Sequence, residues 1–155
     1  GMLSDLRMIG VCSLAFAFCL ALGQAVGDEA KPVVKFGTLV IEFDGLPNDK
    51  GEVLVGLYND PKKFPKENQA LHNLKGKPSK KKCVIKAMKL PYGEYGVAAM
   101  HDENKSGNMD YNLIGLPKEI YGFSNNKRPV FGPPGFKACR FVIDKPVVKI
   151  KITLK

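Results

Sequence analysis

The chain has 155 residues, which is long enough for one domain with a substantial hydrophobic core. Its formal net charge of +9 suits anionic surfaces such as lipid, polysaccharide or nucleic acid. It contains no helix-turn-helix or zinc-finger spacing, and its lysine run holds no aromatic residues, so we expect no specific nucleic-acid recognition.

Residues 1–25 have the pattern of a secretory signal peptide. Arg7 gives a short positive region, residues 8–22 are apolar and uncharged, and small residues precede a cleavage point near Ala25. An uncleaved anchor helix is the alternative, but this run is shorter than the roughly 20 apolar residues that cross a bilayer. We therefore expect export to the periplasm or the extracellular space.

The mature chain would consist of a linker, residues 26–33, and a single β-sandwich domain, residues 34–155. Gly1, which precedes a methionine, is interpreted as a cloning scar. Two of the four cysteines would leave with the signal peptide, and Cys83 and Cys139 remain. They form one disulfide, as an exported protein permits, or stay as two buried thiols, and the sequence leaves both alternatives open.

Apolar and polar side chains alternate in six segments of the mature chain, which is typical of half-buried strands. Proline and glycine clusters separate these segments, as turns require. The pattern predicts an all-β fold, an antiparallel β-sandwich of about seven strands with one long ordered loop. The expected inward residues are Leu39, Ile41 and Phe43; Val53, Val55 and Leu57; Cys83, Ile85 and Ala87; Tyr95, Val97 and Ala99; Cys139, Phe141 and Ile143; and Val148, Ile150, Ile152 and Leu154.

The phrase "LPYGEYGV" joins two of these strands. We expect Tyr95 to pack its ring inward at a corner of the sandwich and to bond its hydroxyl to nearby backbone. The phrase resembles the Leu-Pro-x-Gly-x-Tyr turn of transthyretin-like and carboxypeptidase-regulatory-like sandwiches. This resemblance implies a transthyretin-like or immunoglobulin-like fold and says nothing about function.

Residues 101–135 form a long, glycine-rich stretch whose many apolar residues favour an ordered loop over disorder. Its beginning has the spacing of a calcium loop, with Asp102 as the first ligand and Gly107 at the sixth position, where the chain turns sharply. Leu113 occupies the place of the usual bidentate Glu, so Glu119 or Asn112 would have to complete the shell, and binding would be weak. The candidate Ca²⁺ ligands are Asp102, Asn104, Ser106, Asn108, Asp110 and Glu119.

The same residue types build turns by bonding their own backbone, and this alternative stays open. A second alternative is a hydrolase or isomerase that uses His101 with Asp102 or Glu119. However, neighbouring side chains of a strand face opposite ways, and the chain has no G-x-S-x-G or H-E-x-x-H motif. We therefore expect that the protein is not an enzyme.

The lysine run "KGKPSKKKC" carries five lysines between Lys75 and Lys82. A solvated loop is the favoured interpretation. The alternative is a surface for a polyanion or another anionic component of the cell envelope.

The string "HDENKSGNMDYNLIGLPKEIYGFSNN", followed by "FGPPGF", resembles the signature of a secreted bacterial family, domain-of-unknown-function family 2141. Residues 34–154 fit the plan of that family. The resemblance implies export and a sandwich fold, without an established activity. It also implies that polar residues of the string carry the function, and the candidate binding residues are His101, Asn112, Tyr121, Ser124, Asn125 and Asn126.

Together these patterns predict an exported, monomeric, non-enzymatic binding or envelope-associated module. Apart from a possible Ca²⁺ in the loop of residues 102–119, no cofactor is expected. The sequence does not name a ligand or a partner.

Overall fold

The computed structural model describes residues 27 and 29–155. Residues Val33–Lys155 form one compact unit, which contains all the described strands and helices. The predicted signal peptide and its cleavage point near Ala25 lie outside the described residues. In the part of the chain that the structure describes, no helix is long and apolar enough to cross a membrane.

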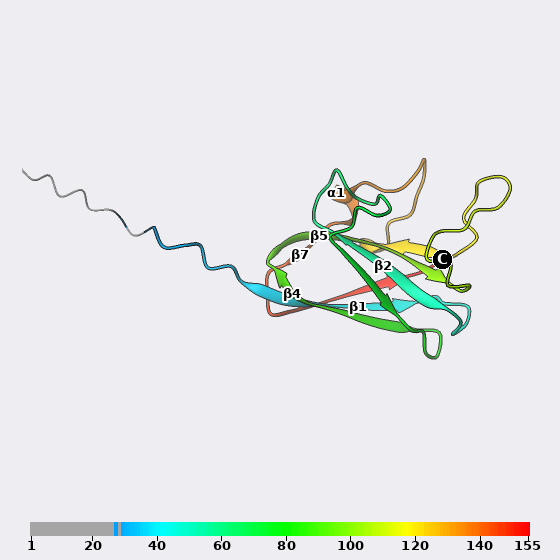
Figure 1. The fold of residues 1–155 in the computed structure, drawn as a ribbon, viewed down its shortest axis with the longest axis horizontal. Helices are drawn as coiled ribbons and strands as arrows, with labels where there is room; N and C mark the ends of the chain where they lie inside the picture. Colours follow the sequence, from blue (N-terminus) through cyan, green and yellow to red (C-terminus); the bar gives the residue numbers. More distant parts are fainter. Residues whose placement is uncertain (1–26, 28) are drawn as a thin grey trace, which may run out of the picture. The chain divides into compact units, whose positions relative to one another are not determined.

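Within the described residues the fold is almost entirely β, which confirms the predicted class (Figure 1). One short helix, α1, and one 3₁₀ turn, η1, accompany the strands. The strands are β1 Phe36–Asp44, β2 Glu52–Tyr58, β3 His72–Gly76, β4 Cys83–Pro91, β5 Gly93–Asp102, β6 Tyr121–Phe123, β7 Phe141–Ile143 and β8 Val147–Thr153; η1 is Ser124–Asn126 and α1 is Phe136–Cys139.

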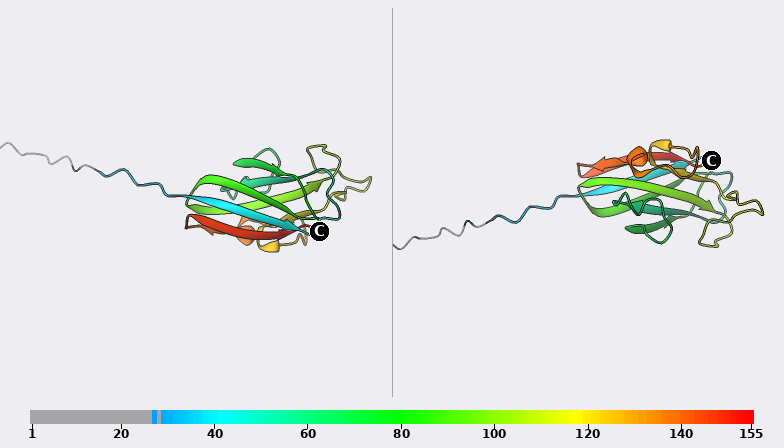
Figure 2. Two further views of the ribbon diagram at one scale, coloured as in Figure 1. Left: turned by 90° about the horizontal axis from the view of Figure 1, so that it is seen from below. Right: turned by 90° about the horizontal axis from the view of Figure 1, so that it is seen from above.

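The strands form two sheets that pack face to face as a sandwich (Figure 2). One sheet has the order β4-β1-β8, and the other has the order β3-β2-β5-β6, with β7 also paired to β5. All pairings are antiparallel except that of β1 with β8, where Thr38–Asp44 runs parallel to Val147–Thr153. Alternation of side chains does not reveal strand direction, so the sequence could not predict this parallel pair.

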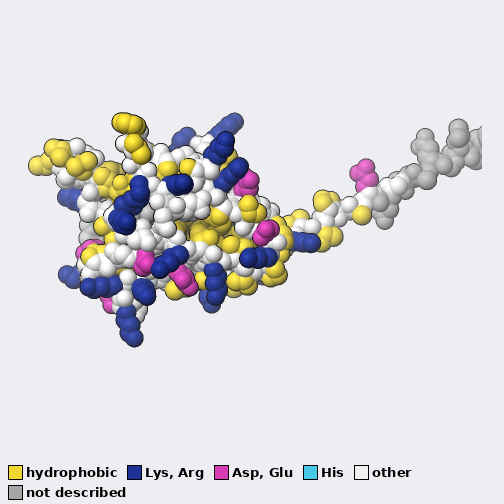
Figure 3. All heavy atoms as spheres, turned by 180° about the vertical axis from the view of Figure 1, so that it is seen from behind, with side chains coloured by type: hydrophobic (Ala, Val, Ile, Leu, Met, Phe, Trp, Pro, Cys, Tyr) yellow, Lys and Arg dark blue, Asp and Glu magenta, His cyan; other side chains and the backbone are white. Residues whose placement is uncertain are grey.

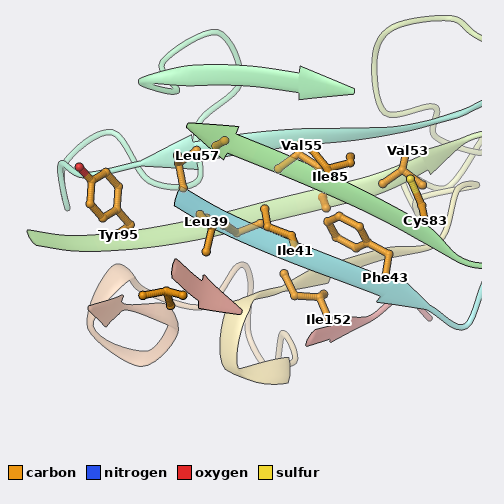
Figure 4. Close-up of a cluster of buried hydrophobic side chains, with 14 of the residues drawn as sticks. Leu39, Ile41, Phe43, Val53, Val55, Leu57, Cys83, Ile85, Tyr95 and Ile152 are labelled. Atoms are coloured by element: carbon orange, nitrogen blue, oxygen red, sulfur yellow. The ribbon is translucent and has the colours of Figure 1, made fainter. Parts of the chain in front are cut away.

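The core lies between the sheets and is built by the inward residues that alternation predicts (Figure 4). Leu39, Ile41 and Phe43 of β1 are buried, and they face Val53 and Leu57 of β2 across the interior. Burial of large aliphatic and aromatic side chains is the main favourable term in folding. This core fixes the register of both sheets, because a slip of one residue would turn these side chains toward solvent.

The predicted corner at Tyr95 is confirmed. Tyr95 is buried, and its hydroxyl donates a hydrogen bond of 2.6 Å to the carbonyl oxygen of Pro91. The bond ties the start of β5 to the end of β4, and it satisfies a polar group that the ring carries into the core.

Two strands and the helix differ from the expectation. The polar strand β3 lies at a sheet edge and the three-residue β6 lies inside the long loop, so neither has enough apolar alternation to be predicted. Cys139, expected inside a strand, lies at the end of α1, and strand β7 begins only at Phe141.

A second apolar cluster covers part of the outer face of the five-stranded sheet. Phe64 lies at its centre, with ring centroids 5.2 Å from Tyr58, 6.2 Å from Phe123 and 5.8 Å from Phe136. Cys139 belongs to this cluster, whereas Cys83 belongs to the core between the sheets. Both cysteines are buried free thiols, so the disulfide alternative does not describe this structure.

Candidate functional site

The loop between β5 and β6, residues 103–120, begins where β5 ends beside the start of β2. Glu52 pairs there with Asp102, the last residue of β5. Gly51 has φ +67°, and a Cβ at this position would meet the carbonyl oxygen of Asp102. A glycine is therefore required where the turn before β2 packs against the start of the loop.

Asp102 organises the first half of the loop from a buried position. One of its carboxylate oxygens accepts a hydrogen bond of 3.0 Å from the backbone N–H of Ser106, and the other accepts one of 2.8 Å from Gly107. Asn104 donates to the Asp110 carboxylate at 2.7 Å, and Ser106 donates to the carbonyl of Asn108 at 2.9 Å. The side chains of Asp102, Asn104, Ser106 and Asp110 thus bond to one another or to nearby backbone, whereas the predicted ligand Asn108 takes part through its backbone.

The second half of the loop is held in the same way. The N–H of Asp110 donates to the Glu119 carboxylate at 2.7 Å. The side-chain oxygen of Asn112 accepts from the N–H groups of Ile114 and Leu116 at 3.1 and 2.9 Å. These are turn bonds of the kind that Asp and Asn commonly make with nearby backbone, which is the alternative that the sequence left open.

The carboxylates of this loop influence one another. The pKa of Glu119 is raised, first by burial and also by the charges of Asp110 and Asp102, while the Asp110 N–H acts in the opposite direction. Among residues 27 and 29–155, no group of three or more His, Cys, Asp and Glu side chains is arranged to hold a metal ion.

His101 is fully buried at the end of β5. Its Nε2 lies 2.6 Å from the carbonyl oxygen of Lys50, and its Nδ1 lies 3.9 Å from a carboxylate oxygen of Glu103. The hydrogen bonds of the described residues do not join His101 to Asp102 or Glu119, the partners that a catalytic role would need. In this structure His101 ties the turn before β2 to β5.

The "YGFSNN" block also holds backbone in place. The Ser124 hydroxyl accepts from the N–H of Val97 at 2.9 Å and donates to the carbonyl of Cys139. Asn125 donates to the carbonyls of Ala138 and Arg140 at 3.2 and 2.9 Å. Asn126 accepts from the N–H of Thr153 at 2.9 Å. The block therefore joins β5, α1 and β8.

The lysine run forms the turn between β3 and β4. The N–H groups of Lys80 and Lys81 donate to the Asp49 carboxylate at 2.9 and 2.6 Å, and both residues have positive φ. Lys75 forms an ion pair of 3.6 Å with Glu52. Asp49 thus holds the backbone of this turn, and Glu52 pairs with the charge of one of its lysines.

A groove with a volume of about 900 Å³ lies on the outer face of the five-stranded sheet. Its floor comes from outward residues of β2, β5 and β6, including Leu54, Ala98, Met100 and Tyr121. Its walls come from three loops, residues 65–68, 105–117 and 129–133. The predicted site residues Asp102, Asn108 and Tyr121 line this groove, whereas His101 does not.

The strand floor was not predicted, although the sequence carries a signal for it. In β2 and β5 the outward positions Leu54, Ala98 and Met100 are apolar, like the inward ones. Strands that are apolar on both faces have something covering both faces. Here loops cover only part of the outer face, and the groove is the remainder.

The fold and the groove define a β-sandwich with a loop-walled recess on one sheet. The chain belongs to the family described as "Uncharacterized protein conserved in bacteria (DUF2141)", whose model matches residues 41–151. This confirms the family that the sequence resembles. Searches of curated proteins and of solved structures gave no match.

Proposed function

We propose that the protein is an exported binding module that holds its ligand in the groove over β2, β5 and β6. The observation that carries the proposal is the groove itself. Its volume of about 900 Å³ lies within the range of roughly 300–1,000 Å³ that is usual for ligand pockets. Binding is the activity that a recess of this size over a rigid sheet supports, and it is the activity that we propose.

The chemistry of the lining suggests the class of ligand. Gly56, which has no side chain, and the apolar side chains of Ala98 and Met100 form the floor beside Tyr121. Amide side chains stand at the rim, at Asn68 and other positions. An apolar floor with hydrogen-bonding edges suits an elongated molecule with an apolar body and polar groups along its length.

The amphipathic dye 1-anilinonaphthalene-8-sulfonate is a suitable first probe. We expect its fluorescence to rise with the native protein, and Met100→Glu to weaken binding because the charge lies in the apolar floor. Met88→Glu is the matched control, since Met88 is exposed on β4 of the other sheet. Both variants add one negative charge, so equal binding by the two would contradict a groove site.

A calcium ion is the second ligand that we propose, for the loop of residues 102–119. The hydrogen-bonded loop supports it, because its bend gathers the side-chain oxygens of Asp102, Asn104 and Asp110. Burial is the main cause of the raised pKa of Glu119, and a cation would offset the smaller contribution from the charges of Asp110 and Asp102. Millimolar calcium should then raise the melting temperature of the protein by mass action, and Asp110→Asn should reduce the shift. Equal melting temperatures with calcium and with chelator would contradict calcium binding and would show that the loop is a turn held by its own side chains.

A further inference from the structure

We propose that two apolar loop tips dock the protein on an anionic lipid bilayer. The first tip carries Leu113 and Ile114, whose relative exposures are 107% and 79%. The second tip carries Val130 and Phe131, at 81% and 101%. Single exposed apolar residues are ordinary on a protein surface, but fully exposed pairs on two loops indicate an interaction site.

A hydrogen-bonded turn holds the first tip in its exposed position. Asn112 accepts hydrogen bonds from Ile114 and Leu116, and its own carbonyl accepts one of 2.9 Å from the N–H of Gly115. Gly115 has φ +78°, a conformation that favours glycine. The polar network therefore fixes a shape in which Leu113 and Ile114 point away from the core.

Both tips belong to loops that wall the same groove. Tyr111, Gly115 and Pro117 line it from the first loop, and Pro129 and Gly132 line it from the second. In Figure 1 these are the yellow loop at the right and the light-brown loop at the top. Figure 3, which views the molecule from behind, shows apolar side chains gathered on projections at the upper left. The tips thus stand on one side of the molecule.

The charge around the tips identifies the partner. No Asp or Glu occurs between Glu119 and Asp144, while Lys127, Arg128 and two further basic residues lie in this interval. Lys118 lies four residues after Ile114 in the first loop, next to Glu119. Basic residues beside exposed apolar side chains are the combination that binds anionic lipid, because the charges attract the headgroups and the apolar groups enter the interface.

A bilayer fits this geometry better than a flat protein partner does. The tips are separate projections with a groove between their loops, and a fluid surface can close around each of them. A second copy of this chain is the competing occupant. Self-association would bury the tips in the absence of lipid, and the second experiment below would detect it.

The first experiment measures sedimentation with vesicles of phosphatidylglycerol and phosphatidylcholine, and with phosphatidylcholine alone. We expect binding to the anionic vesicles, weakened by salt. Leu113→Ser with Ile114→Ser, or Val130→Ser with Phe131→Ser, should lower it by about tenfold or more. Val84→Ser with Met88→Ser removes exposed apolar side chains from β4 and should leave binding unchanged.

The second experiment uses the absence of tryptophan from the chain. Single variants Leu113→Trp and Phe131→Trp place a reporter on each tip, and Met88→Trp places one on β4. Anionic vesicles should shift the tip emission to shorter wavelength, and brominated lipid should quench it. The Met88→Trp emission should not change, which separates docking by the tips from any attachment through the N-terminal segment.

Three results would overturn the proposal: tip emission that vesicles leave unchanged, an equal shift for Met88→Trp, or a blue shift that grows with protein concentration without lipid. The last result would assign the tips to self-association. The proposal does not rest on the groove ligand, because the tip variants leave the groove floor intact and Met100→Glu leaves the tips intact.

Discussion

Single polar side chains in the family string act mainly by holding backbone. Asp102 and Asn112 accept hydrogen bonds from backbone N–H groups of the loop that follows them, and Ser124 bonds to main-chain groups of β5 and α1. Buried or half-buried backbone groups need such partners wherever a loop leaves the sheet. These residues therefore position the groove wall and the first tip.

Asp102→Asn tests this role. Its carboxylate receives two backbone N–H groups while buried, and an amide would turn a donor toward one of them. We expect the free energy of unfolding to fall by about 1–3 kcal/mol in urea titrations.

The exposed neighbour Glu103 supplies the control. Glu103→Gln should change the free energy of unfolding by no more than about 0.5 kcal/mol. If both variants prove equally stable, the two amide bonds to Asp102 do not hold the loop.

The two cysteines of the domain should be unreactive in the native state. Burial raises the pKa of the Cys83 thiol and, against a smaller opposite effect of Lys127, that of Cys139. Only the thiolate reacts quickly, so alkylation at neutral pH should be slow at both sites and rapid in denaturant. Mass spectrometry of the peptides measures each site separately, and a peptide carrying both cysteines as a disulfide would contradict the separate clusters.

Strands β2 and β5 contribute both to the core and to the groove. Their inward residues build the core, and their outward residues provide the floor of the groove. The neighbouring strands β3 and β6 widen this floor, and the loops that follow β5 and η1 wall it. The core on one face of these strands thus supports the floor of the groove on the other.

The corner at Tyr95 joins β4 to β5 and offers a direct test of an element contact. Tyr95→Phe removes the hydroxyl that donates to Pro91 and keeps the packed ring. We expect a loss of about 1 kcal/mol in unfolding free energy, because the carbonyl of Pro91 loses its partner. Tyr92→Phe changes a neighbouring tyrosine as the control, and a loss as large as that of Tyr95→Phe would show that the corner bond is not special.

Much of this architecture follows from the sequence, because alternation is local and the inward positions of β1, β2, β4 and β5 alternate over most of each strand. The parallel partner of β1, the edge strand β3 and the short β6 depend on contacts distant in the chain, which alternation does not encode. For the loop, composition gave the residues that come together. It did not distinguish side chains aimed at a cation from side chains aimed at the backbone, since both use the same oxygens at the same spacing.

Over the whole molecule, the two sheets separate a closed core from an open recess. The two apolar tips project from loops that wall the recess. The chain as a whole has a formal net charge of +9. This arrangement allows a bilayer and a groove ligand to be engaged from one side. Export would bring the module to such a surface, and the N-terminal pattern of residues 1–25 is what supports it.

An amide NMR titration of the protein with 1-anilinonaphthalene-8-sulfonate tests the central claim, because it locates the bound dye residue by residue. We predict shifts concentrated at Leu54, Ala98, Met100 and Tyr121 on the outer face of the five-stranded sheet. Shifts concentrated on β4 around Met88, or confined to the lysine turn between β3 and β4, would contradict a ligand groove over β2, β5 and β6.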